Sequence, residues 1–220
     1  RKTIPANSKV SIWEVMARCA LSGEQERELK RYAEKLGLIF LSTPFSRAAA
    51  DRLQEIGVKW FKIGSGECNN YPLVEHIASF RKPMIVSTGM NDISSIRKTV
   101  AILRKYKVPY ALLHCTNIYP TPWNRIYLQA ITKLKEAFPD AVVGLSNHSK
   151  GPWAALGAVA LSASVLERHF TSDRSWKGED IPVSMDPKEL KMILEGSRAI
   201  WESRGDRKGP VKEEKPTIDC

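Results

Sequence analysis

The chain has 220 residues and a mass of 24.7 kDa, and its 43% hydrophobic content is ordinary for a globular protein with a sizeable core. Its formal net charge of +10 comes from basic residues that are spread over helix-like segments and mixed with acids, which argues against nucleic acid as a partner and remains compatible with a small anionic substrate. No apolar run approaches the ~18 residues that a membrane span needs, and the first residues, RKTIPANSK, lack the apolar stretch of a signal peptide, so we expect a cytoplasmic protein without a membrane partner.

Helical and strand-like patterns alternate along most of the chain. The first 37 residues read as two helices, and apolar residues at three- and four-residue spacing predict further helices after each of the strand-like runs. The last predicted helix covers residues 186–205. The apolar, β-branched runs of strand length are LIFLST (38–43), WFKIGS (60–65), PMIVST (83–88), YALLHC (110–115), VVGLSN (142–147) and SVLERHF (164–170).

This β-α-β-α order indicates a parallel sheet covered by helices, either an open doubly wound sheet or a (β/α) barrel. No Gly-rich dinucleotide fingerprint follows the first strand, which disfavours the doubly wound sheet. Strand starts fall 22 to 32 residues apart, and eight such units would give the ~250 residues that are usual for a barrel. We therefore predict an α/β fold of the (β/α)8 TIM-barrel type over residues 1–204, lacking the first two strand units, and a linker over residues 205–220 that leads to an absent domain.

Each predicted strand is apolar along its length but ends in a group of polar residues, which a buried core would not require. In a parallel barrel the carboxyl ends of all strands point to one face, so these side chains should converge there. Several hydroxyls, glycines that allow close approach and one ammonium group suit a phosphate-bearing ligand. The alternative is that Ser and Thr merely terminate strands. The candidate anion-binding residues are Thr43, Lys62, Ser65, Ser87 and Ser146.

Two histidines end adjacent predicted strands. His148 and His169 could therefore both reach one cation, with water or a substrate oxygen completing its ligands, although a histidine in such a place can also be structural. His114 lies within a strand and could be buried or support the site from behind, and His76 reads as a surface or packing residue. The four cysteines are far apart and form no CxxC pair, so we expect reduced thiols at Cys19, Cys68, Cys115 and Cys220.

Six motifs stand in order along the chain: STPFS (42–46), KIGSGECNNYPL (62–73), STGM (87–90), LLHCTNIYPTP (112–122), GLSNHS (144–149) and LERHFT (166–171). Together they resemble the sialic acid (N-acetylneuraminate) synthase family, which includes the legionaminate and pseudaminate synthases. The resemblance covers essentially the whole chain, and the second and fourth motifs are the most specific. It implies a (β/α)8 barrel followed by a small antifreeze-like domain, in a domain-swapped homodimer whose partner's small domain caps the barrel.

The resemblance also implies a reaction. Phosphoenolpyruvate would condense with an N-acetylhexosamine such as N-acetylmannosamine, in the presence of Mn²⁺ or Mg²⁺, to give a nine-carbon 2-keto sugar acid and phosphate. Carried over by motif, His148 and His169 would hold the metal, and Glu67 would stabilise a cationic centre or activate water. The five candidate anion-binding residues would hold phosphoenolpyruvate. The amino sugar would contact Asn7, Asn117, Tyr119 and Asp180.

The chain departs from the family pattern at Asn147, where an Asp usually precedes the first metal-binding histidine. Loss of that charge would be expected to change metal affinity or its pH dependence. The two absent strands and the absent cap would normally supply further substrate contacts, so we expect the isolated chain to bind weakly or to be inactive. Two alternatives stay open, namely a legionaminate or pseudaminate synthase that takes a different amino sugar, and an inactive barrel fragment. Glu67 could also serve only as an ion-pair partner of Lys62.

Overall fold

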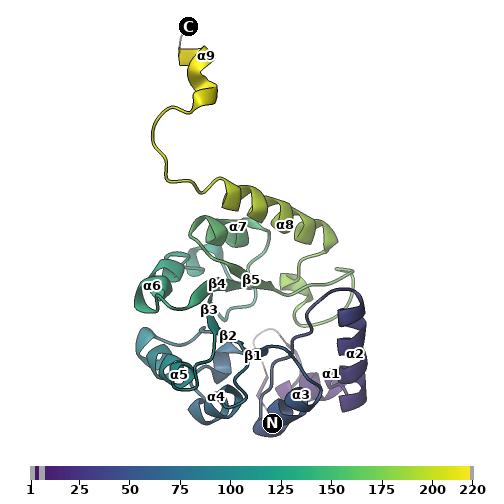
Figure 1. Cartoon of the computed structure of the whole chain (residues 1–220). Helices are drawn as coiled ribbons and strands as arrows, with labels where there is room; N and C mark the ends of the chain where they lie inside the picture. The colour runs from purple at the N-terminus through teal and green to yellow at the C-terminus, as the bar shows by residue number, and fades with distance from the viewer. Residues whose placement is uncertain (1–2, 5–7, 219–220) are drawn as a thin grey trace.

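The computed structural model describes residues 3–4 and 8–218 and shows a curved parallel sheet wrapped by helices (Figure 1). The five strands follow each other in the order β1-β2-β3-β4-β5, so each pairs with the next along the chain. Every pair is parallel, with Lys62 opposite Ile85 and Ser146 opposite Glu167. The strands are β1 (Phe61–Ile63), β2 (Met84–Ser87), β3 (Tyr110–Cys115), β4 (Val142–Asn147) and β5 (Val165–Arg168).

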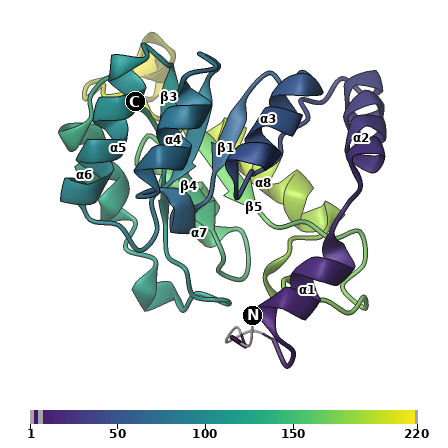
Figure 2. The same cartoon turned by 90° about the horizontal axis from the view of Figure 1, so that it is seen from below.

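Helices lie on the convex side of this sheet, and two more flank its open side (Figures 1 and 2). Their starts are set by local chemistry: Ser11 and Ser22 form capping boxes, and Asp92 and Asp186 accept backbone hydrogen bonds at the N-termini of α5 and α8. The helices are α1 (Ile12–Cys19), α2 (Gly23–Lys35), α3 (Arg47–Glu55), α4 (Tyr71–Ala78), α5 (Ile93–Lys105), α6 (Gln129–Ala137), α7 (Trp153–Ala160), α8 (Pro187–Glu202) and α9 (Lys215–Ile218).

Side-chain alternation separates an apolar face of the sheet from a polar one. Phe61 and Ile63 on β1 and Leu145 on β4 belong to the core that packs against the helices. The residues between and beside them, including Lys62 and Ser146, point to the concave face, because successive side chains of a strand point to opposite sides. The fold is that of a (β/α)8 barrel to which the described residues contribute five parallel strands. The predicted fold class is thus confirmed.

The prediction of a strand over residues 38–43 is wrong. Residues 38–43 are irregular, and Leu38 and Ile39 are 61% and 52% exposed. A strand exists only where a neighbour completes its hydrogen bonds, and no described segment pairs with this one on either side. The predicted strand over 164–170 is shorter than expected, and beyond it Phe170 makes one isolated bridge to Met185.

After α8 the C-terminal segment runs away from the barrel, and a 3-10 helix, η4 (Lys212–Glu214), leads into α9 near its end (Figure 1). That short helix is not among the predicted elements. Within the described residues, no helix combines the length and the apolar character required to cross a bilayer. The cysteines that are described, Cys19, Cys68 and Cys115, are unpaired, as predicted.

Candidate functional site

Lys62 is the centre of a polar network on the concave face of the sheet. It is only 6% exposed, and its Nζ donates hydrogen bonds to Ser87 Oγ at 2.8 Å and to the carbonyl of Ile63 at 2.9 Å. Glu167 Oε2 lies 3.4 Å from the same nitrogen, and Ser146 Oγ donates to Glu167 Oε1 at 2.8 Å. Side chains from β1, β2, β4 and β5 therefore meet at one point.

The electrostatics of this network favour an anionic ligand. Burial lowers the pKa of Lys62, and the nearby carboxylate of Glu167 acts in the opposite direction without cancelling the effect. A buried ammonium with one partly exposed countercharge gains from any further negative charge brought beside it. The network can therefore receive a phosphate or carboxylate group.

Three further predicted residues lie at the loops that follow β1 and β2. Ser65 Oγ accepts a hydrogen bond from the backbone N–H of Gly89 at 3.1 Å. A Cβ atom placed on Gly89 would lie 2.3 Å from Asn117 Oδ1 and 2.8 Å from Ser65 Oγ, so only glycine fits between these two side chains. Thr43 lies farther along the rim, with its Cγ2 3.7 Å from the Cβ position of Gly64. Thr43, Ser65 and Asn117 thus border the same face as Lys62.

Glu67 does not pair with Lys62, contrary to one of the two interpretations of its role. It ends the 3-10 helix η1 (Ser65–Glu67), and its Oε2 accepts a hydrogen bond from Asn70 Nδ2 at 2.6 Å. The partner of Lys62 is Glu167 instead. The Glu67 carboxylate is therefore not used to neutralise the buried ammonium.

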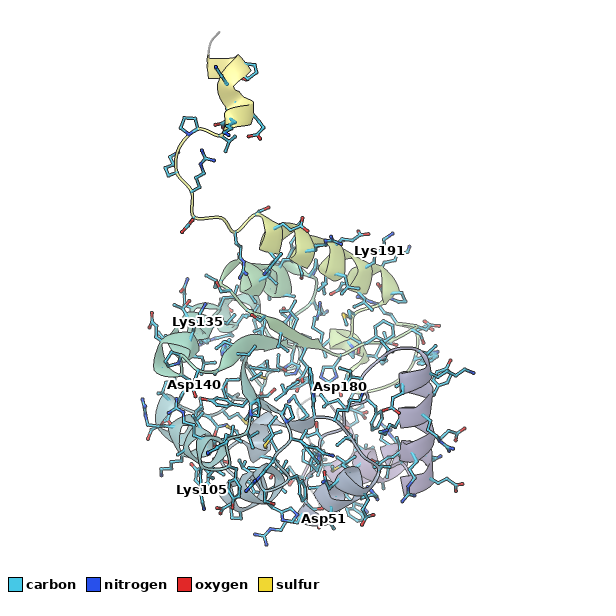
Figure 3. The ribbon with its side chains drawn as sticks, viewed as in Figure 1. Asp51, Lys105, Lys135, Asp140, Asp180 and Lys191 are labelled. Carbon is cyan, nitrogen blue, oxygen red and sulfur yellow. The ribbon has the colours of Figure 1, made fainter. Side chains whose placement is uncertain are left out.

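An aromatic cluster lies beside the Lys62 network. The rings of His148 and Tyr119 stack with centroids 4.0 Å apart, and the ring of His169 lies 5.3 Å from His148 and 5.8 Å from Tyr119. Asp180 Oδ2 is 3.6 Å from His169 Nδ1. Asp180 lies toward the concave side of the sheet, whereas Lys105 and Lys135 lie at the periphery (Figure 3). The structure thus brings together four of the predicted site residues.

The tautomer of His148 follows from its neighbours. Its Nδ1 lies 3.1 Å from the carbonyl of Thr116, which can only accept, so Nδ1 carries the proton. Nε2 then accepts a hydrogen bond from the hydroxyl of Tyr119 at 2.9 Å. Burial lowers the pKa of His148, which keeps the ring neutral near pH 7. The Nε2 lone pair of His148 is therefore occupied by Tyr119, and a ligand that bound this nitrogen would have to displace the Tyr119 hydroxyl.

The other two histidines lie outside this cluster. His114 points to the helix side of β3, where its Nε2 lies 2.6 Å from the carbonyl of Ile126, and burial lowers its pKa. His76 on α4 is bonded to Asp51 at 2.7 Å. These positions agree with the structural interpretations predicted for both residues. Asn7, the remaining predicted sugar contact, lies outside the described residues.

Asn147 lies on the opposite side of β4 from His148. Its Oδ1 accepts a hydrogen bond from the N–H of Ser149 at 3.0 Å, while its buried Nδ2 has no partner among the described residues. Nε of Arg168, the register partner of Asn147 on β5, is likewise buried without an acceptor there. Two buried donors on the helix side of the sheet, Asn147 Nδ2 and Arg168 Nε, thus have no described acceptor.

Glu167 is the functional residue to which sequence reasoning attached no role. Its position two residues before His169 on the same predicted strand places it on the same face of the sheet, and this spacing could have identified it. Its partners could not be read from spacing, because Lys62 and Ser146 come from other strands.

Comparison with known proteins identifies the family. The NeuB family model matches residues 1–209. An N,N'-diacetyllegionaminic acid synthase of Campylobacter jejuni is 40% identical over 88% of this chain and 58% of its own length, and the human N-acetylneuraminate-9-phosphate synthase is 36% identical over 84% and 51%. A crystal structure of the N-acetylneuraminic acid synthetase from Leptospira borgpetersenii, in complex with citrate, superposes with a TM-score of 0.88 at 33% identity, covering 94% of this chain and 72% of that chain.

The chain covers only part of these relatives, between 46% and 63% of the length of the curated ones. The matched part contains the Lys62 network and the His148 cluster, both within residues 1–209. The resemblance indicated by the six motifs is confirmed: this chain belongs to the NeuB family.

Proposed function

We propose that the protein containing this chain is a phosphoenolpyruvate-dependent transferase that condenses phosphoenolpyruvate with an N-acetylhexosamine of the N-acetylmannosamine type. Its products would be a nine-carbon 2-keto sugar acid and inorganic phosphate. The names of the relatives, which are sialic, legionaminic and pseudaminic acid synthases, support this reaction class. The observation that carries the proposal is that the buried Lys62 network lies next to the imidazoles of His148 and His169, at the carboxyl ends of the strands.

Phosphoenolpyruvate would bind at the Lys62 network. Its phosphate and carboxylate need several donors and a countercharge. Lys62 supplies the charge and is hydrogen-bonded to the Ser87 hydroxyl, and the Ser146 hydroxyl is linked to the same ammonium through Glu167. Binding would draw the ammonium and the Ser146 hydroxyl away from Glu167. Thr43 and Ser65 would close the rim of this subsite.

A divalent cation, Mn²⁺ or Mg²⁺, would be held by His148 and His169. The donor chemistry fits, because the Nδ1–H of His148 is fixed by a backbone carbonyl and its Nε2 keeps a lone pair, as in many metal-binding histidines. No group of three or more His, Cys, Asp or Glu side chains in the part of the chain that the structure describes is arranged for a metal, so water and substrate would supply the other ligands. When bound, such an ion polarises a carbonyl oxygen.

The remaining residues would place the two substrates and guide water. A bond would form between C3 of phosphoenolpyruvate and the aldehyde carbon of the open-chain sugar, whose oxygen would take up a proton to become a hydroxyl. Water would add at C2 with loss of one proton, and the C2–O bond to phosphate would then break as the added oxygen gives up its second proton to the leaving phosphate and becomes the keto group. Glu67, free of any pairing with Lys62, would accept the proton from that water. The amino sugar would lie against Asn117, Tyr119 and Asp180, with Asn7 as a further contact.

The test is phosphate release by the purified protein with phosphoenolpyruvate and N-acetylmannosamine, with and without Mn²⁺. We expect release to require the cation and to fall at least about a hundredfold in His148→Ala, since a whole ligand is removed. His76→Ala is the matched control, because His76 is bonded to Asp51 away from the cluster. Equal rates with and without Mn²⁺, and in both variants, would refute the proposed role of the imidazoles.

A further inference from the structure

Arg168 is a buried cation at the end of β5 that belongs neither to the Lys62 network nor to the imidazole cluster. Its side chain is 2% exposed. It points to the helix side of the sheet, because its neighbours in the chain, Glu167 and His169, point to the concave face. Arginine is almost never fully buried unless it is paired, so the partners of Arg168 indicate its role.

The guanidinium of Arg168 joins three segments of the chain. Nη2 donates to the carbonyl of Ser149 at 2.9 Å and Nη1 donates to the carbonyl of Gly151 at 2.9 Å, both in the loop that follows β4. Nη2 also donates to the carbonyl of Val183 at 3.4 Å, in the connection from β5 to α8, and Nη1 donates to the carboxylate of Glu189 in the first turn of α8. One side chain thus ties the loop after β4 and the connection after β5 to the same helix.

These contacts lie where the pairing of the two strands has ended. The last residues paired between β4 and β5 are Asn147 and Arg168, so His148 and His169 each lie one residue beyond the paired strands. There the carbonyls of the two histidines accept hydrogen bonds from two different loops. Strand pairing therefore sets the face to which the imidazoles point, but it does not by itself fix the distance between them.

We propose that Arg168 is a positioning residue for the proposed cation site, and that its guanidinium holds the segments of His148 and His169 at the separation at which both imidazoles reach one ion. This inference rests on the proposed function. Arg168 directly precedes His169, and the carbonyl of Ser149 that it binds belongs to the residue directly after His148. Its hydrogen bonds therefore act within one residue of each imidazole, and the centroids of the two rings lie 5.3 Å apart.

An arginine suits this position better than a lysine. The planar guanidinium carries its donors on separate nitrogens in a fixed fork, so it can bind several carbonyls and a carboxylate at once. A lysine ends in a single ammonium without this fork. The side chain of Glu189 is 11% exposed and pairs with both Arg168 and Arg174, so the buried guanidinium has a countercharge.

The test measures the binding of two probes to the full-length protein and to Arg168→Lys, namely Mn²⁺ by electron paramagnetic resonance and phosphoenolpyruvate by calorimetry in EDTA. We expect Mn²⁺ to bind at least about tenfold more weakly to the variant, because groups that orient metal ligands typically contribute ten- to a hundredfold to affinity. Phosphoenolpyruvate should bind as it does to the wild type, because Ser146 and Glu167 lie within the paired strands. Arg174→Lys is the matched control and should bind both probes normally, since Arg174 pairs with Glu189 and Asp186 instead of the loop after β4.

A second measurement requires no cation. Hydrogen exchange followed by mass spectrometry should show the backbone amides of residues 148–152 and 169–171 exchanging at least about tenfold faster in Arg168→Lys, because these segments open locally. The amides of β1 and β2 should exchange at the wild-type rate. If Arg168→Lys does not fold, Arg168→Gln/Glu189→Gln takes its place with the same expected results, because removing both members of a buried ion pair leaves no unpaired charge.

The outcomes separate this inference from the proposed function. Wild-type affinity for Mn²⁺ in the Arg168 variant, or an equal loss of affinity for both probes, would overturn the positioning role. A wild-type protein that bound no Mn²⁺ would contradict the proposed cation site, and the exchange rates would then decide about Arg168. Faster exchange confined to the two histidine segments would support its role in holding them, and unchanged exchange would overturn it.

Discussion

Replacing Glu167 by Gln should destabilise the protein, because it removes the countercharge of a buried lysine. Loss of one partner costs about 3–5 kcal/mol in fully buried pairs and about 0–1 kcal/mol in exposed ones. The Lys62 side chain is 7% exposed and that of Glu167 is 39% exposed. We therefore expect Glu167→Gln to lower the free energy of unfolding by roughly 1–3 kcal/mol at pH 7, between these limits.

The effect of Glu167→Gln should depend on pH in a defined direction. The folded-state pKa of Lys62 is lowered below its unfolded value of 10.5, so the unfolded chain binds the proton more readily than the folded protein does. The free energy of unfolding therefore rises as the pH increases from the folded-state pKa of Lys62 to 10.5. Without the charge of Glu167 the pKa of Lys62 falls further. The destabilisation caused by the substitution should therefore shrink as the pH is raised toward 10.5.

Urea-induced unfolding, followed by tryptophan fluorescence at several pH values, measures both effects. Glu202→Gln is the control, because its pair with Arg198 is exposed and should contribute no more than about 0.5 kcal/mol. Lys62→Met/Glu167→Gln should recover part of the lost stability, since removing both charges leaves no unpaired ammonium. A pH-independent effect of Glu167→Gln, equal to that of the control, would refute this account of the pair.

Three further substitutions test the geometry of the site. Gly89→Ala should raise the KM for phosphoenolpyruvate about tenfold and lower the free energy of unfolding by about 1–3 kcal/mol, because the new Cβ would lie 2.3 Å from Asn117 Oδ1. Steady-state kinetics measure the first effect, and urea unfolding measures the second. Tyr119→Phe should leave Mn²⁺ binding, measured by calorimetry, as tight or tighter, because His148 Nε2 loses a competing donor; weaker binding would contradict the tautomer. Asn147→Asp should raise the free energy of unfolding by about 1 kcal/mol, because it removes a buried amide donor without a described acceptor; a fall would show that the added charge costs more.

The helices were the most predictable part of the fold, because their signals are local. Asp92 and Asp186 precede apolar residues at helical spacing, and each caps the helix that was expected to start there. The strand predicted over 38–43 failed for the opposite reason. Its sequence is as apolar and β-branched as that of β2, but strand formation requires a neighbouring strand, and composition does not say whether one is present.

The convergence of Lys62, Ser146 and His148 was predictable from topology alone, because the strands are parallel and their carboxyl ends share one face. The identity of the partner of Lys62 was not. Lys62 lies on the first strand of the sheet and Glu167 on the last, and their side chains meet only because the sheet curves. Curvature depends on the packing of all strands and helices, so no local pattern could choose between Glu67 and Glu167.

The register between β4 and β5 explains how the two parts of the site stay aligned. Ser146 lies opposite Glu167, and two residues farther along the chain lie His148 and His169. Each of these neighbouring segments thus supplies one residue to the lysine network and one to the imidazole pair, separated by two residues or about 6.6 Å of strand. A shift of one residue in either strand would turn both of its site residues toward the helices. The anion-binding network and the imidazoles are therefore aligned by the same register, and a shift of register cannot displace one without the other.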